Sequence, residues 1–337
     1  MKRITINDIA KTVGVSRTTV SRVISNNGYV SKSNRAKILE VIKKSNYKPS
    51  IIARGLRTKK TRTIGLLIPD LENPAFGRLA KGISESLTNL DYNLIICNSN
   101  YDSETEKKNI DILLNRDADG IIIATPNEKL ENIVKIFIKN SIPIMILEKA
   151  ESEIINYIAV DHYYGGQLAA EYLIRLGHKN IFFLGNLEVI DVLERYKGFK
   201  DTLEKSNIFL NQNIFLKRIN DMEECKNIVN KILEDFKNLD AIFAANDIIA
   251  SQTLVTLYEN NIRVPEEISV IGYDNIPFSE MTLIPLTTIM VPLYSLGEMA
   301  AKELVKIIEN PLDKEAVKIL LKDGVELIER KSCKNIN

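Results

Sequence analysis

Hydroxyl and guanidinium side chains gather in one short segment near the start of this 337-residue chain. The segment contains Ser16, Arg17, Thr18, Thr19, Ser21 and Arg22. On a helix over residues 17–24, most of these side chains would lie on the face opposite Val20, Val23 and Ile24. Arginine, serine and threonine hydrogen-bond the edges of bases and phosphate oxygens. The segment therefore predicts a surface that contacts DNA.

A second group of polar side chains follows apolar segments in the rest of the chain. Its members are Asp70, Glu72, Asn73, Asn98, Glu148, Lys149, Asp161, Asn246, Asp247 and Asp274, with Phe76 close by. Ligands of parallel sheets bind outside the carboxyl ends of the strands, and carboxylates and amides beside an aromatic ring suit a ligand rich in hydroxyls. A structural role stays open for each residue, because Asp and Asn after a strand also cap the next helix.

Catalytic and metal-binding signatures are missing from the sequence. GxGxxG, GxxxxGK[ST], HExxH and GxSxG motifs do not occur. We expect His162 to be a helix-start neighbour and His178 a surface turn residue, neither of them catalytic. Cys97, Cys225 and Cys333 show no CxxC spacing, which argues against a disulfide framework and a cysteine zinc site. We therefore expect no enzyme activity, no cofactor and no metal.

The net charge of +1 hides a strong asymmetry along the chain. Residues 1–62 carry 16 Lys and Arg but only two acids, Asp8 and Glu40, whereas residues 63–337 carry 29 basic and 42 acidic side chains. A small basic module is typical of proteins that bind a phosphate backbone, and an acidic body would be repelled by it. We expect DNA contacts to come from the first 62 residues alone.

The basic segment predicts three short helices. The first covers residues 5–12, with Thr5 as N-cap and Asp8 as its capping-box partner, and Gly14 ends it. Ser16 caps the second helix, over residues 17–24, which gives a helix-turn-helix spacing. A third helix over residues 32–45 would complete the core with Ala36, Ile38, Leu39, Val41 and Ile42.

A basic linker, residues 48–62, follows. The stretch from Ser50 to Leu56 is too short to hold a helix in isolation, so we expect it to fold only when docked. Ala53 and Leu56 form an apolar stripe beside Arg54 and Arg57. An apolar wedge flanked by arginines fits the DNA minor groove.

The body alternates strands with helices. Strands are predicted over residues 63–69, 93–98, 119–124, 142–147, 157–160, 179–185, near Ile214, 240–245 and 268–274. Helices are predicted over 74–90, 104–116, 129–140, 163–176, 195–206, 222–236 and 248–260. Continuous apolar strands require parallel sheets covered on both faces. The predicted fold is a small all-α head plus an α/β core of two doubly wound parallel-sheet lobes.

Membrane and export signals are lacking. No apolar run approaches the roughly 18 residues that span a bilayer, and the start lacks the apolar stretch of a signal peptide. We expect a cytoplasmic protein without a membrane partner.

The segment TINDIAKTVGVSRTTVSRVISNNGYVSKSNRAKILEVIKKSNYKPSIIARGLRT resembles the head and hinge of the LacI/GalR family of bacterial transcription regulators. PDLENPAF, VDHYYGGQLAAEYLIRLGHKNIFFLG, ERYKGF, AIFAAND and ISVIGYDNIP resemble the family's core, so the resemblance covers nearly the whole chain. It implies base reading by Arg17, Thr18 and Arg22. It places Thr5, Ser16, Thr19, Ser21, Tyr29 and Ser31 near phosphates. It also implies that paired hinge helices, with Ser50 and Ala53, insert Leu56 into the minor groove.

The resemblance also implies an effector site in a core similar to periplasmic sugar-binding proteins. Asn73 and Phe76 match ligand contacts of the first lobe, and Arg195, Asn246 and Asp274 match those of the second. The strand-end residues Glu148, Lys149 and Asp161 complete the predicted site. The family's Asp-Arg pair is Glu148-Lys149 here, and a frequently polar position is Val291. A common pentose or hexose is therefore not implied; a larger, modified or phosphorylated sugar, a nucleoside, or no ligand all stay open.

These expectations define an organisation and a function. Residues 1–47 form the DNA-binding domain, 48–62 the hinge and 63–331 the core, with lobe 1 at 63–161 plus 292–320 and lobe 2 at 162–291 plus 321–331. The predicted protein is a homodimeric repressor that binds a palindromic double-stranded DNA operator and responds to a sugar or sugar derivative. The alternative is control by a protein co-regulator of the phosphocarrier type. A transport protein is disfavoured by the basic head.

Overall fold

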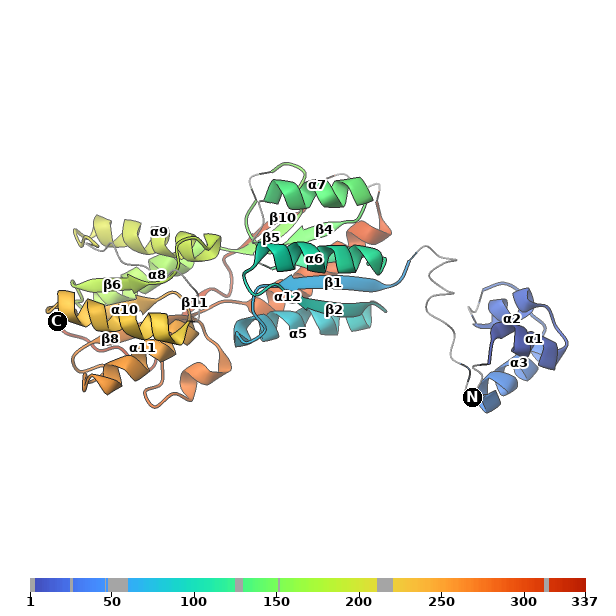
Figure 1. Cartoon of the computed structure of the whole chain (residues 1–337), viewed down its shortest axis with the longest axis horizontal. Coiled ribbons are helices and arrows are strands. Elements are labelled where there is room, and N and C mark those ends of the chain that lie inside the picture. The colour runs from blue at the N-terminus through green and yellow to red at the C-terminus, as the bar shows by residue number, and fades with distance from the viewer. Residues whose placement is uncertain are drawn as a thin grey trace. The chain divides into compact units, whose positions relative to one another are not determined.

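The computed structural model describes residues 4–24, 27–45, 47, 60–124, 130–150, 152–210, 221–311 and 315–337. The chain divides into two compact units, residues 1–62 and 63–337 (Figure 1). The predicted hinge helix with Ser50, Ala53 and Leu56, and the predicted strand near Ile214, lie outside the described residues.

The first unit contains the three predicted helices, α1 (Ile6–Val13), α2 (Arg17–Ile24) and α3 (Lys32–Ser45). The capping box is confirmed, because the Thr5 side chain accepts from the backbone N–H of Asp8, and the Asp8 carboxylate accepts from the backbone N–H of Thr5. Gly14 ends α1 in the left-handed conformation at φ 72°. The Ser16 hydroxyl accepts from the backbone N–H of Thr19 at 3.0 Å, which confirms the predicted cap of α2.

The core of this unit is smaller than predicted. Ile9, Ala10, Val20, Val23 and Ile38 are its buried apolar side chains. The prediction that Ala36 and Leu39 complete this core is wrong, since both are exposed, Leu39 by 49%. The reason is geometric: α3 packs along one line through Ile38, and at about 100° per residue Leu39 lies about 100° and Ala36 about 200° around the helix from that line.

The second unit contains two sheets. The first has the strand order β10-β5-β4-β3-β1-β2, and all its pairs are parallel. Its strands are β1 (Thr63–Ile68), β2 (Asn93–Asn98), β3 (Gly120–Ile123), β4 (Ile144–Ile146), β5 (Tyr157–Val160) and β10 (Lys318–Leu321). The helices of this lobe are α5 (Pro74–Asn89), α6 (Ser103–Asn115), α7 (Leu130–Asn140) and α12 (Leu293–Glu309).

The second sheet has the order β11-β9-β8-β7-β6 and is parallel except for the β11–β9 pair. Its strands are β6 (Ile181–Leu184), β7 (Ala241–Ala244), β8 (Ser269–Asp274), β9 (Thr287–Met290) and β11 (Glu326–Ile328). The helices are α8 (His162–Arg175), α9 (Ile190–Lys205), α10 (Met222–Asp235) and α11 (Asp247–Glu259), with the 3₁₀ turn η1 (Pro277–Glu280). The chain therefore passes from one sheet to the other three times, after β5, after β9 and after β10. Each sheet and its helices form one lobe, and both lobes can be followed in Figure 1.

One helix boundary of the second unit differs from the prediction by more than one residue. Helix α9 begins at Ile190, five residues before the predicted start at Arg195. The cap residue is Val189, which makes no side-chain capping bond, so the sequence carries no start signal there. The extra turn adds Asp191 to the helix.

Within the described part of the chain, no helix combines the length and the apolar character that crossing a bilayer requires.

Candidate functional site

The exposed face of α2 carries the predicted DNA contacts. Arg17, Thr18 and Arg22 are exposed, whereas Val20 and Val23 are buried against α1 and α3. The helix therefore presents two guanidinium groups and a hydroxyl to solvent without disturbing its core. This is the arrangement a helix needs to enter a major groove.

Three of the residues predicted near phosphates lie at helix N-termini. Thr5, Ser16 and Ser31 precede α1, α2 and α3, and each accepts a hydrogen bond from a backbone N–H of the first turn. A helix N-terminus attracts anions because its first N–H groups and the helix dipole point outward. Of the other predicted contacts, Tyr29 is 89% exposed, and Thr19 and Ser21 are half-buried.

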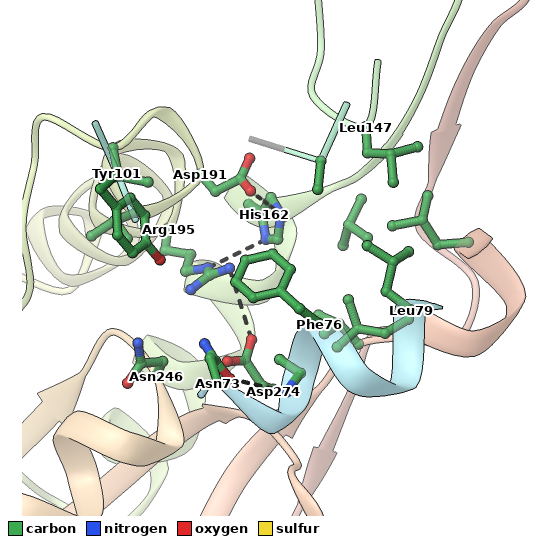
Figure 2. Close-up of a pocket in the computed structure, with 18 residues that line it drawn as sticks. Asn73, Phe76, Leu79, Tyr101, Leu147, His162, Asp191, Arg195, Asn246 and Asp274 are labelled. Atoms are coloured by element: carbon green, nitrogen blue, oxygen red, sulfur yellow. Dashed lines mark hydrogen bonds and ion pairs between the residues drawn. The ribbon is translucent and has the colours of Figure 1, made fainter. Parts of the chain in front are cut away.

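A cavity opens in the second unit at the carboxyl ends of the strands (Figure 2). The space between its lining atoms, counted together with open solvent at its mouth, is about 710 Å³. Residues from both lobes line it: Asn73, Ala75, Phe76, Leu79, Tyr101, Ala124, Leu147, Val160, His162, Val189, Asp191, Val192, Arg195, Asn246, Asp274, Val291, Leu293 and Leu296.

Arg195 is the central polar residue of this cavity (Figure 2). Its Nη1 donates to the carbonyl oxygen of Ala245 at 2.7 Å, and its Nε donates to Nδ1 of His162 at 3.3 Å. Its Nη2 lies 3.9 Å from Oδ1 of Asp274. The guanidinium also stacks on the Tyr273 ring, 3.9 Å from its centroid. Protein groups therefore contact all three guanidinium nitrogens.

The hydrogen bonds of His162 assign its protonation. Its Nδ1 accepts from Arg195 and lies 2.9 Å from the Tyr273 hydroxyl, so the ring proton belongs on Nε2, which faces Oδ2 of Asp191 at 3.4 Å. Burial lowers the pKa of His162, which keeps the imidazole neutral at pH 7. Burial acts to raise the pKa of Asp191, but the hydrogen bond from His162 and the positive charge of Arg195 outweigh it and hold that pKa below the ordinary value.

Asp274 is the last residue of β8, and Asn73 and Asn246 directly precede α5 and α11. Burial raises the pKa of Asp274 to about 7, against the attraction of Arg195. Asp274 has a φ of 105°, a conformation that costs energy for a residue with a Cβ. Asn73 Oδ1 caps α5 through Ala75 N at 2.9 Å, and Asn246 Oδ1 caps α11 through Ile249 N at 2.8 Å. Both asparagines thus combine a capping role with a place in the cavity wall.

Close helix packing positions Arg195 and His162. A Cβ on Gly166 of α8 would collide with the backbone oxygen of Arg195, and one on Gly198 of α9 would collide with that of Tyr163. Glycine at these two positions lets α8 and α9 approach until their backbones touch.

The cavity brings together five of the eight predicted effector residues: Asn73, Phe76, Arg195, Asn246 and Asp274. The other three do not line it. Glu148, which follows the lining residue Leu147 in the chain, is buried outside the cavity wall. Lys149 is exposed, and Asp161 accepts from the backbone N–H of Tyr164 at the start of α8.

Sequence reasoning missed two polar lining residues and misplaced one of the two histidines, His178. Tyr101 lies in the loop after β2, and Asp191 lies on the first turn of α9, where no cap marks a helix start. His162 does begin α8, but it is buried and bonded inside the cavity wall. The prediction of His178 as a surface residue is wrong: it is 1% exposed, with Nδ1 3.1 Å from Asp240 and Nε2 3.2 Å from the carbonyl oxygen of Lys334.

Comparisons with known proteins match both units. Residues 5–50 match the family model described as bacterial regulatory proteins, lacI family, and residues 61–330 match periplasmic binding proteins and sugar binding domain of LacI family. The ribose operon repressor of Halalkalibacterium halodurans is 34% identical over 314 residues, 92% of each chain. The transcriptional repressor PurR of Histophilus somni is 32% identical over 335 residues, 98% of this chain and 99% of its own.

Solved structures agree in fold. The lac repressor dimer bound to operator and the anti-inducer ONPF matches with a TM-score of 0.87 at 26% identity, over 99% of this chain and 100% of that chain. A LacI family regulator from Enterococcus faecium with bound ribose matches with a TM-score of 0.72 at 31% identity, over 82% of this chain and 100% of that chain. With its helix-turn-helix head and two-lobed parallel-sheet core, the chain belongs to the LacI family of bacterial DNA-binding transcription regulators.

Proposed function

We propose that this protein is a transcriptional repressor that binds a palindromic operator as a homodimer and is controlled by a sugar-like effector in the cavity between its lobes. The observation that carries the effector part is the cavity at the carboxyl ends of both sheets, with the buried Arg195–Asp274 pair in its wall. In this proposal residues 1–47 bind DNA, 48–62 form the hinge and 63–331 bind the effector and the second copy.

The head supports operator binding through charge and shape. Arg17, Thr18 and Arg22 project from α2, and three capped helix N-termini offer N–H groups to phosphates. The relatives add support, since a ribose operon repressor aligns with 92% of this chain and a lac repressor solved on its operator shares the fold.

Exposed apolar side chains support a homodimer. Val255 and Tyr258 lie on α11 with exposed fractions of 53% and 72%. Phe278, Met281 and Leu283 follow β8 and are 59%, 72% and 88% exposed. Large apolar side chains in such number are typical of a protein interface, and a second copy of the chain is the occupant we propose.

We propose that the effector acts by shifting a conformational equilibrium. A ligand that contacts both Phe76 of lobe 1 and Arg195 of lobe 2 binds more tightly when the lobes are close. It therefore changes the population of the closed core and, through the hinge, the affinity for DNA. The sign of this effect, induction or corepression, is an outcome of the experiment.

The test is selection of DNA fragments by the full-length protein, followed by fluorescence anisotropy on the recovered sequence. We expect a sequence with two symmetric half-sites, a dimer-to-DNA stoichiometry of one, and an affinity that changes when a small effector is added. Enrichment of no sequence contradicts the proposal. A symmetric operator whose affinity changes only with an added phosphocarrier protein contradicts the small-molecule part alone.

A further inference from the structure

A hydrogen bond joins the two lobes beside the cavity. Nη1 of Arg78, on α5 of lobe 1, donates to the backbone carbonyl oxygen of Asn275 at 2.7 Å. Asn275 directly follows β8 of lobe 2, whose last residue, Asp274, lines the cavity (Figure 2). Because the donor and the acceptor belong to different lobes, this bond breaks when the lobes move apart.

The acceptor is held in place by other parts of lobe 2. The Asn275 side chain accepts from Nη2 of Arg330 at 2.8 Å, and the next residue, Ile276, donates its backbone N–H to the buried carboxylate of Asp247 at 2.8 Å. Asp274 and Asn275 have φ values of 105° and 53°. Two such residues in succession persist only where the surrounding structure holds them. The position of the Asn275 carbonyl is therefore set by lobe 2 and does not depend on Arg78.

The donor is an exposed arginine on the helix that carries part of the cavity wall. Among the described residues Arg78 forms no ion pair, so no carboxylate competes with the Asn275 carbonyl for its guanidinium group. The positive charge strengthens a hydrogen bond to a carbonyl oxygen. Phe76 and Leu79, on the same helix, both line the cavity. Helix α5 thus contributes to the cavity wall and also bridges to lobe 2.

We infer that Arg78 is a positioning residue of the effector site, a latch whose bond to Asn275 holds α5 of lobe 1 against the turn that carries Asp274. Among the described residues, Arg78 is not part of the cavity lining, so it acts through this turn and not by contact with the ligand. The inference rests on the proposed function, because it names a residue that regulates the same cavity.

The latch stabilises the closed arrangement of the lobes before an effector binds. A net hydrogen bond of this kind changes the ratio of closed to open core by roughly threefold to tenfold. Loss of the latch lowers the fraction of closed core, and the apparent affinity for an effector that binds the closed core falls in proportion. Through the hinge, the same loss changes the affinity for DNA without any effector.

The experiment is hydroxyl-radical footprinting of the full-length protein without ligand, read by mass spectrometry. Phe76 and Tyr101 are oxidisable, half-buried and part of the cavity lining, so they report on opening of the lobes. We expect their labelling rates in Arg78→Ala to rise by about twofold or more relative to that of Tyr258, which is 72% exposed on α11. The melting temperature should stay within about 2 °C of wild type, because Arg78 is exposed.

Two matched variants separate the latch from a general effect of losing a surface cation. Lys81→Ala removes an exposed cation from the same helix, where Lys81 pairs with Glu85 at 3.9 Å, and should leave the labelling unchanged. Arg78→Lys keeps a charged donor and should label less than Arg78→Ala. Labelling that is unchanged in Arg78→Ala, that rises equally in Lys81→Ala, or that is not reduced by lysine overturns the inference and leaves the proposed function standing.

Operator affinity of the same proteins tests the link to DNA binding. On the operator recovered by DNA selection, anisotropy titrations without effector should give an affinity for Arg78→Ala that differs from wild type by about threefold or more. Raised labelling with an unchanged operator affinity confirms the latch and overturns its link to DNA binding. A wild-type protein that selects no operator contradicts the proposed function, whereas the footprinting result still decides whether Arg78 holds the lobes together.

Discussion

Replacing Glu148 with glutamine should stabilise the folded protein. Burial, with repulsion from Asp191 and Glu106, raises the pKa of this carboxyl from its ordinary 4.5 to about 9. The folded chain therefore holds the proton at pH 7, whereas the unfolded chain releases it. A group that binds its proton more tightly when folded makes the free energy of unfolding fall as the pH rises from about 4.5 to about 9.

The size of this effect follows from the difference between the pKa of Glu148 in the unfolded chain and in the folded chain. Each pH unit above 4.5 costs about 1.36 kcal/mol of stability, so the cost reaches about 3 kcal/mol at pH 7. Glutamine has nearly the same shape and does not titrate. Glu148→Gln should thus raise the free energy of unfolding by up to about 3 kcal/mol at pH 7, with little difference near pH 4.5.

Urea unfolding at several pH values measures this difference. Far-UV circular dichroism is the suitable signal, because the chain contains no tryptophan. Glu326→Gln, at an exposed position, is the matched control and should change stability little at any pH. A Glu148→Gln protein that is less stable than wild type at pH 7, or a stability difference that does not vary with pH, would refute the reasoning.

Three other predictions concern the operator, the dimer and the packing of the core. Arg17→Ala should weaken operator binding by roughly 1–3 kcal/mol, because it removes a guanidinium from the exposed face of α2; anisotropy titrations measure this, and an unchanged affinity would exclude base reading by Arg17. Met281→Glu should convert the dimer to monomer, since it places a charge on the exposed apolar segment after β8; an unchanged sedimentation coefficient would argue against this interface. Gly166→Ala should lower the melting temperature, with a loss of roughly 1–3 kcal/mol, because its Cβ meets the carbonyl oxygen of Arg195; an unaltered melting temperature would contradict the packing described for α8 and α9.

Local interactions made much of this molecule predictable from sequence. The Thr5 and Asp8 capping box, the left-handed Gly14 and the Ser16 cap lie within a few residues of the helices they bound, so all three helices of the head could be predicted closely. The apolar strands could also be predicted from sequence, because a strand that is buried on both faces has a continuous run of apolar residues. Strand ends pointed to Asn246 and Asp274, and the family resemblance pointed to these two residues and to Arg195.

Tertiary structure alone decided the rest of the cavity. Tyr101, His162 and Asp191 are far apart in the sequence and belong to two lobes, and the packing of the lobes brings them to one cavity. No sequence pattern distinguishes a buried Glu148 from an exposed Lys149 beside it, because burial depends on which helices cover the end of β4. The raised pKa of Glu148 follows from this burial and not from composition, since a carboxyl group buried in this way keeps its proton because other parts of the fold exclude water from it.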